Sequence, residues 1–554
     1  MASIQYVSPP ESKFQPIFSV GSSVQKHRFT ELFSNQSGEY SYNGNKTVKI
    51  NISSVNEVLK GTESYLKFKI KFNGPANSLA LNPGGLQNIF HRVRLLTQNG
   101  TELENLDNYN MWYNIMSYCT MSKEYVNSKQ WTEFDSYEDG VISYRSVEET
   151  VDLLDGSDNA TYTTGSRTVA LSGNASSKAF RVGLKVGDTI KMVTDEGNFV
   201  SKVESITTEA SDDYKFVLED DDVPGANVSA GDLKELYVIN NNGEDELLAP
   251  RSEICTNRDY VEVCVKLNLQ CLLKSQFFPL MLVKQGLQLE LNLEDPNLVM
   301  YSRRTPNTYD ITALFSYSIK DVAYVASLYT LDQKTIEDMY LKDYNSNEGL
   351  KMNIQGVHSS MKNVSGSNDQ FSDLVNKRSC RAVYTVITSS NISTNINDTS
   401  KCNESLSTFL KDGLQNFYYK SQSLRFPDYE IDTSDKYNTE AYTHLMNALK
   451  KHMNIQHEPR FTIKEYSGLN RNSLIVDDNG TDSTIEDSTK FIIGMRLDRH
   501  SSSYSGIDLS VNPLDTVFRF SGSIDSKLGT REIRNFIVYD RTIKISKNGI
   551  QYVD

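Results

Sequence analysis

The sequence Gly-Leu-Gln-Asn occurs twice, at residues 85–88 and 413–416, which are 328 positions apart. In both places a Tyr-Asn pair follows 24 residues after the glycine, at 109–110 and at 437–438, and opens a helical pattern. A four-residue identity arises about once by chance in a chain of this length, so the shared offset and context carry the inference. The repetition predicts that the chain contains the same fold twice, with Gly85 and Gly413 at equivalent positions.

Alternating apolar and polar residues predict strands along most of the chain. Val48, Ile50 and Ile52 alternate with polar residues, and the same period appears at 66–72, 261–269 and 287–293. Asn-Gly pairs at 99–100 and 548–549 predict tight turns. Helical patterns are limited to short stretches after Tyr109 and Thr439 and to a turn near 332–340. The predicted fold class is all-β with a few short helices, arranged as two tandem β-sandwiches.

The chain has 554 residues, which exceeds one hydrophobic core but suits two sandwiches and an insertion. We predict an N-terminal arm at 1–40, a first sandwich at 41–308 and a second at 309–554. We expect residues 323–340 to bridge the halves. Separate terminal strands are expected at 491–497, 507–511, 517–520, 536–539, 542–545 and 550–553.

Residues 151–250 are predicted to be a β-rich insertion, because the strands of the first sandwich resume after them. This segment holds 19 Asp and Glu against 8 Lys and Arg, so it accounts for −11 of the net charge of −14. We expect its ends, at Thr150-Val151 and at 251–253, to rejoin one sheet edge. An acidic insertion between core strands should project into solvent.

Several partner and compartment classes are disfavoured by composition. Binding of a DNA duplex needs clustered Lys and Arg, and the sequence has no strong basic stripe. The six cysteines form no C-x-x-C pair, which indicates free thiols in a reducing compartment. We expect no signal peptide and no transmembrane segment, because no apolar run approaches ~20 residues. A soluble protein made inside a cell is the expectation.

No pattern of catalytic, cofactor-binding or metal-binding residues stands out. His444 and His452 are too far apart for a zinc helix, and the run at 219–222 is interpreted as solvated charge. Residues 477–482 begin like a calcium loop, but the sixth position is Asp482 and the twelfth is Ser488. We therefore predict no catalytic residue, no cofactor and no metal site, and hence no enzyme.

These patterns resemble the double jelly-roll major capsid proteins of icosahedral double-stranded DNA viruses, in particular the virophage and polinton-like virus branch. The resemblance spans nearly the whole chain except 151–250. It rests on the strand and hairpin at 85–104 with the helix at 109–116, the strands at 278–293, the segment 413–427 with its helix, and the terminal strands at 491–553.

The resemblance implies a homotrimeric capsomer, or hexon, that tiles an icosahedral capsid. Two similar domains per chain give a threefold trimer nearly six equal sides, which suits a hexagonal lattice. The implied partners are other copies of the chain and a penton or minor capsid protein, with no sequence-specific nucleic acid. The implied location is the virion, after assembly inside the host cell. The insertion would face outward and could contact the host surface, while the arm would be disordered or run along the inner face.

Two other functions remain open at this stage. A carbohydrate-binding or carbohydrate-cleaving β-sandwich would show exposed aromatic residues and, if hydrolytic, a carboxylate pair; the only tryptophans are Trp112 and Trp131. A receptor-binding attachment protein would more typically carry a fibrous repeat or a coiled coil, and neither pattern is present.

Overall fold

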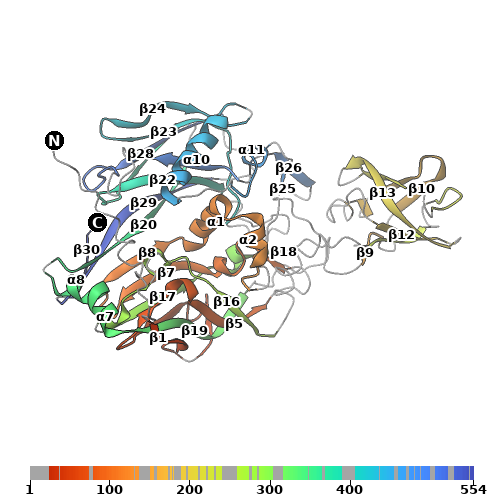
Figure 1. The fold of residues 1–554 in the computed structure, drawn as a ribbon. Helices are drawn as coiled ribbons and strands as arrows, with labels where there is room; N and C mark the ends of the chain where they lie inside the picture. Colours follow the sequence, from red (N-terminus) through yellow and green to blue (C-terminus); the bar gives the residue numbers. More distant parts are fainter. Residues whose placement is uncertain are drawn as a thin grey trace.

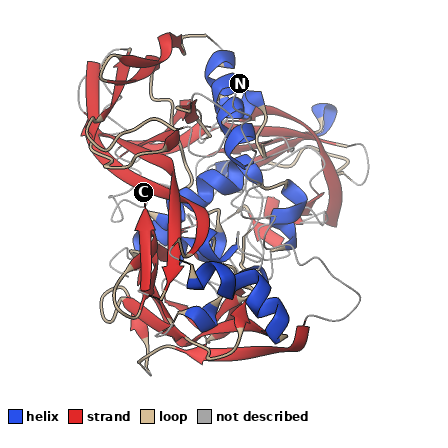
Figure 2. Ribbon diagram, turned by 60° about the vertical axis from the view of Figure 1, so that its left-hand side comes forward, coloured by secondary structure: helices blue, strands red, loops and turns tan. Residues whose placement is uncertain are grey.

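The structure, a computed structural model, describes residues 24–553 with gaps. The gaps of five residues or more are 74–78, 136–149, 180–188, 240–258, 303–315, 390–405, 454–458, 499–505 and 522–529. The described residues form two β-sandwiches and a separate sheet (Figure 1). Figure 2 shows several helices gathered between the sheets of the two sandwiches.

The first sandwich pairs two antiparallel sheets. One has the order β1 (Val24–Phe33), β19 (Ser316–Leu331), β5 (Tyr65–Asn73) and β16 (Val261–Val265), with β2 (Tyr40–Ser41) and β4 (Val58–Leu59) beside β19. The other has the order β3 (Thr47–Ile52), β17 (Leu287–Leu293), β7 (Phe90–Thr97) and β8 (Glu102–Asp107). Its helices and small strands are η2 (Gly61–Glu63), β6 (Leu79–Leu81), η3 (Gly85–Ile89), α1 (Tyr109–Thr120), α2 (Lys123–Ser128), α5 (Gln270–Leu273), η6 (Leu280–Leu282), α6 (Pro296–Val299) and β18 (Met300–Ser302).

The second sandwich repeats this plan. Its first sheet has the order β20 (Leu350–Val364), β29 (Arg531–Ser546), β22 (Cys380–Ser389) and β27 (Ile492–Arg496), with β30 (Gly549–Val553) beside β29. Its other sheet has the order β21 (Asn368–Asp373), β28 (Leu514–Phe520), β23 (Leu414–Ser421) and β24 (Leu424–Asp432). The remaining elements are α10 (Thr439–Met453), α11 (Ile463–Tyr466), β25 (Ser473–Asp478) and β26 (Thr481–Glu486), and the sandwiches are joined through α7 (Gln333–Ile336), η7 (Glu337–Leu341) and α8 (Lys342–Asn345).

The two sandwiches match strand for strand. The order β1-β19-β5-β16 corresponds to β20-β29-β22-β27, and β3-β17-β7-β8 corresponds to β21-β28-β23-β24, in the same chain order. Helices α1 and α10 both follow the hairpin of the smaller sheet. Each sandwich also carries extra strands at the same point, before β16 or before β27. The predicted duplication is confirmed at the level of topology.

The short sequence identity is not itself a structural equivalence. Residues 85–89 form η3, which precedes β7, whereas Leu414 is already the first residue of β23. The residues directly before the two helices, Asn108 and Asn438, both adopt left-handed backbone conformations with φ of 53° and 49°. The helices therefore correspond with an offset of 330, and the predicted equivalence of Gly85 and Gly413 is wrong.

Side chains on the inner faces of the sheets fill each sandwich. In the first, Phe68 of β5 meets Phe90 of β7 with ring centroids 6.1 Å apart. In the second, Thr385 of β22 and Tyr419 of β23 share a hydrogen bond of 2.7 Å between buried hydroxyls. Phe68 belongs to the period-two stretch at 66–72, and it lies inside because alternate side chains of a strand point to opposite faces.

The insertion has a sheet and a hydrophobic core of its own. Its strand order is β10 (Asn159–Thr163), β11 (Thr168–Ser172), β14 (Asp213–Leu218), β13 (Gly197–Glu209), β12 (Thr189–Thr194), β15 (Leu233–Ile239) and β9 (Thr150–Asp152). Buried residues such as Tyr162, Met192 and Phe216 form a cluster separate from the core of the sandwiches. In Figure 1 this sheet stands to one side of both sandwiches. Thr150 and Val151 pair with Ile239 and Val238, so the insertion begins at 150, and these residues do not rejoin a sandwich edge as predicted.

We expect that replacing residues 150–250 by a short Gly-Ser linker will leave both sandwiches folded, because the insertion core is independent of theirs. Differential scanning calorimetry should show the melting transition of the sandwiches shifted by only a few degrees. The matched comparison is removal of the β25–β26 hairpin, which occupies the corresponding place in the second sandwich. If the variant without the insertion were insoluble while the variant without the hairpin stayed soluble, the insertion core would not be independent of the sandwiches.

Several predicted boundaries are wrong. Residues 24–33 are not part of an arm but form β1, which pairs with β19. The stretch 323–329 does not bridge the halves either, because it lies inside β19, so the first sandwich extends to Leu331 and the second begins at β20. The strands expected at 536–539 and 542–545 are parts of the single strand β29, and 507–511 is not a strand. Residues 1–23 lie outside the described part of the chain.

Candidate functional site: the junction between the sandwiches

Helix α1 of the first sandwich lies on the outward face of the sheet β20-β29-β22-β27 of the second. The ring of Trp112 stacks on Phe536 of β29, with centroids 5.6 Å apart, and meets Tyr384 of β22 edge-on at 5.8 Å. Trp112 is only 4% exposed, and buried residues of both sandwiches belong to one continuous cluster. The two sandwiches are thus joined through a shared hydrophobic core, which we call the junction.

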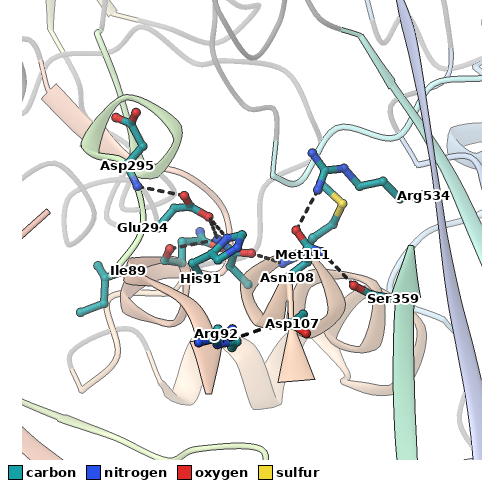
Figure 3. A network of polar contacts seen from close by, with 12 residues as sticks. Ile89, His91, Arg92, Asp107, Asn108, Met111, Glu294, Asp295, Ser359 and Arg534 are labelled. Carbon is teal, nitrogen blue, oxygen red and sulfur yellow. Dashed lines mark hydrogen bonds and ion pairs between the residues drawn. The ribbon is translucent and has the colours of Figure 1, made fainter. Parts of the chain in front are cut away.

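Polar contacts fix the start of α1 on the second sandwich (Figure 3). The amide of Asn108 donates to Ser359 Oγ of β20 at 2.8 Å, and its oxygen accepts from Arg534 Nη1 of β29 at 2.8 Å. Nearby, Arg541 Nη1 donates to the carbonyl oxygen of Leu103 in β8 at 2.9 Å. The left-handed backbone of Asn108 suits asparagine, which tolerates that conformation better than most residues.

Two buried cations hold the far end of α1. Lys490 Nζ lies 3.9 Å from the ring centroid of Tyr118 and donates to its hydroxyl at 2.7 Å. Arg460 donates from its backbone N–H to the Tyr118 carbonyl at 2.8 Å and from Nη1 to Ser117 Oγ at 2.9 Å. Cation–π contacts strengthen when the cation is desolvated, as here. Both ends of the helix are therefore anchored by the second sandwich.

The first Gly-Leu-Gln-Asn sequence, at residues 85–88, forms hydrogen bonds with side chains of α1. Asn88 Oδ1 accepts from the Asn114 amide at 2.9 Å, and Asn114 also donates to the carbonyl of Leu406 in the second half of the chain. Gln87 Oε1 accepts from the buried Tyr109 hydroxyl at 2.8 Å. These side chains are satisfied in a buried network, which gives the helix one well-defined position.

A histidine–glutamate pair lies beside this network in the first sandwich (Figure 3). His91 Nδ1 is 2.8 Å from Glu294 Oε2, which also accepts from the Asn110 amide at 2.8 Å, while Oε1 accepts from the Asp295 N–H. The hydrogen bond to Glu294 raises the pKa of His91 against the opposing effect of burial. Burial would raise the pKa of Glu294, but the hydrogen bond and charge of His91, with the other donors, lower it below the ordinary value.

The comparisons with known proteins concern the fold. No family model matches the sequence, and no curated protein matches it. A chain of the Sputnik virophage structure aligns with 100% of this chain and 92% of its own length, at 11% identity and a TM-score of 0.52. This chain has a double jelly-roll fold. Other similar structures are the Faustovirus major capsid protein (9% identity, 94% and 90% coverage, TM-score 0.48) and the mavirus major capsid protein (9%, 100% and 95%, 0.40).

The pH dependence of the double jelly roll should reflect the His91–Glu294 pair. The raised pKa of His91 stabilises the fold below its ordinary value of 6.5, and this stabilisation is lost as pH rises through the raised value. The lowered pKa of Glu294 stabilises the fold above 4.5, and this is lost as pH falls through the lowered value. The pair therefore stabilises the fold most between pH 4.5 and pH 6.5.

We expect His91→Gln to destabilise the double jelly roll most near pH ~5.5 and progressively less toward pH ~9. Urea unfolding of both proteins at several pH values measures this difference. Lys342→Gln, which removes an exposed ion pair with Asp338, is the control and should show little change. A difference between His91→Gln and the original chain that grows with pH would contradict the assigned charges.

The residues singled out from the sequence do not converge on a chemical site. Among the described residues, no group of three or more His, Cys, Asp or Glu side chains could hold a metal ion. Asp477 and Asp482 pair across the β25–β26 hairpin, and His444 lies on α10 with a pKa lowered by burial. Trp131 and residues 220–222 lie outside the described part of the double jelly roll.

The cysteines described fit the free thiols expected from the sequence. Cys119, Cys264, Cys271 and Cys380 form no disulfide bond, and burial raises the pKa of each thiol. None of the helices in the described ranges is both long enough and apolar enough to span a membrane. The residues that the sequence did not single out, Asn108, Ser359, Arg534, Arg460 and Lys490, are those that join the two halves of the double jelly roll.

Proposed function

We propose that this chain is the major capsid protein of an icosahedral double-stranded DNA virus of the virophage or polinton-like kind. The observation that carries the proposal is the duplicated sandwich: two halves share the same order of eight core strands and are joined through one core. The whole-chain likeness in fold to a chain of the Sputnik virophage supports it. The role is structural, and no catalytic step is proposed.

The capsomer in this proposal is a homotrimer. Two like sandwiches per chain give three chains six similar sides, so a threefold assembly can occupy a hexagonal lattice position. A rigid junction is required for this, because movement between the halves would spoil the pseudo-hexagonal outline. We expect each subunit interface to bury well over ~2,000 Å², as in obligate assemblies.

The proposal also assigns partners and an orientation. The trimer would contact neighbouring trimers and a penton or minor capsid protein, and it would reside in the virion after assembly inside the host cell. The acidic insertion would face outward, because its charge of −11 would be repelled by packaged DNA within a Debye length of roughly 8–10 Å. In that position it could contact the host surface.

Trp112 gives no support to the carbohydrate-binding alternative. A sugar platform needs an exposed ring, and Trp112 is 4% exposed and stacked between the sandwiches. No observation on the described residues favours an attachment protein over a shell protein. We therefore retain only the capsid proposal.

Sedimentation velocity of the purified chain tests the proposal. We expect one species with three times the mass of a single chain, stable on dilution to about micromolar concentration. A folded monomer under those conditions would contradict the homotrimer.

A further inference from the structure

The junction covers the outward face of the larger sheet of the second sandwich. The corresponding face of the first sandwich carries exposed side chains. On the covered face, β22 presents the buried ring of Tyr384 to Trp112 of α1, at a centroid distance of 5.8 Å. The corresponding strand of the first sandwich, β5, presents lysines on its outward face, and the side chains of Lys67 and Lys69 are 29% and 41% exposed. The same sheet position is thus used within the chain in one sandwich and left free in the other.

The edge strands show the same asymmetry. Within the chain, β8 of the first sandwich lies against β20 of the second, and Leu103 is fully buried there. The topological counterparts are β24 and β1, which do not meet within one chain. Large apolar side chains are exposed on both: Leu424 (40%) and Tyr429 (50%) on β24, and Phe29 (56%) and Phe33 (62%) on β1.

A shallow hollow marks the open face of the first sandwich. It has a volume of about 230 Å³ and is lined by Glu31 and Phe33 of β1, Lys67 and Lys69 of β5, and Asp321 and Ala323 of β19. Strands β5 and β19 correspond to β22 and β29, between whose side chains Trp112 is seated on the second sandwich. The hollow therefore lies over the same pair of strands as the Trp112 seat.

Several charges near these exposed apolar residues are already paired within the chain. Lys67 Nζ is 3.0 Å from Glu31, and Lys69 Nζ is 3.0 Å from Asp321. On β24, Glu430 is held by two arginines at 3.1 and 3.2 Å, on the face opposite to that of its neighbour Tyr429. Burying such paired charges costs much less than burying a charge that lacks a partner. The Lys67–Glu31 and Lys69–Asp321 pairs can therefore enter an interface without new ionic partners.

We propose that β24 and the start of α10 of one chain pack on β1 and the outward face of β19 and β5 of a second copy. This contact repeats between chains the arrangement that β8 and α1 make with the second sandwich inside the chain. A head-to-tail contact of this kind closes into a ring, and three chains supply six sandwiches. The inference rests on the proposed homotrimer and specifies its interface.

Paired surface variants test the assignment. Phe29→Asp/Phe33→Asp alters the β1 surface and Leu424→Asp/Tyr429→Asp alters the β24 surface; all four positions are exposed, so each variant should fold. We expect each variant alone to raise the dissociation constant of the trimer roughly 30-fold or more, the effect of losing a hot spot. The control is Val511→Asp, at a site that is 82% exposed and lies on neither β1 nor β24, which should remain trimeric. Circular dichroism and melting temperature verify folding.

Mixing the two variants gives the sharper result. The β1 variant retains an intact β24 surface and the β24 variant an intact β1 surface, so an equimolar mixture should form a one-to-one heterodimer that cannot close into a trimer. Sedimentation velocity at tens of micromolar, with one variant labelled, detects this species. Two variants that both remain trimeric, or a mixture without heterodimer, would overturn the interface while the homotrimer stands. A monomeric original chain would overturn the homotrimer and this inference together.

Discussion

Trp112→Ala will lower the free energy of unfolding by about 3–5 kcal/mol, the range for removing a buried tryptophan from a core. The substitution removes the ring that stacks on Phe536 and meets Tyr384, and it leaves a cavity between two sandwiches that are each well packed and cannot easily close it. Because the lost contacts join the sandwiches, we also expect them to unfold less cooperatively, with separate transitions in place of one. Urea unfolding followed by far-UV circular dichroism measures both effects.

Two controls separate the junction from a general loss of aromatic surface. Trp112→Phe should recover most of the stability, because a smaller ring can still contact Phe536. Tyr125→Ala, on α2 at 50% exposure, should change the free energy of unfolding by less than about 1 kcal/mol. If Trp112→Ala were as mild as Tyr125→Ala, the junction would not be the core that the contacts indicate.

Gly85→Ala should destabilise the chain by at least about 3 kcal/mol, because it combines backbone strain with a collision. Gly85 has φ of +53°, and an added Cβ would lie 2.5 Å from the carbonyl oxygens of Glu133 and Phe134, which are backbone atoms that cannot rotate away. The adjacent Leu86 N–H donates to the same Glu133 carbonyl at 2.9 Å, so any shift also breaks this hydrogen bond. Thermal and urea unfolding provide the measurement.

Gly100→Ala is the matched control for Gly85→Ala. Gly100 also has positive φ, +84°, but nothing lies within 4 Å of its added Cβ. It should cost only the backbone strain, about 1–2 kcal/mol. Equal losses for the two variants would show that the collision at Gly85 is relieved and that η3 is not rigidly held.

Strands were predictable from the sequence where one face is exposed to solvent. They were harder to predict where both faces are buried or both are exposed. The alternation at β3 and β5 identified these strands because each has one buried face and one exposed or intermediate face. Residues 323–328 of β19 are buried on both faces, so they lack alternation and were misread as a bridge. The β1 segment is mostly exposed on both faces, so its residues looked like an arm.

The junction could not be located from the sequence because its contacts join distant positions. Asn108 and Arg534 are 426 positions apart, and nothing in the local pattern of either predicts the other. One usable signal was present in the sequence: residues 109–119 include no charged residue and are rich in apolar and aromatic residues on all sides of the helix. The structure buries every one of them. A helix of that kind lies between two layers and does not cover only one.

Cryo-electron microscopy of the purified full-length chain is the most direct test of the capsid proposal. The account predicts threefold particles with a pseudo-hexagonal outline, built from six sandwiches, with three insertions projecting from one face. Fitting the structure should place β24 of one chain against β1 of the next. Particles containing a single chain, or an oligomer without six sandwiches in a ring, would contradict the account.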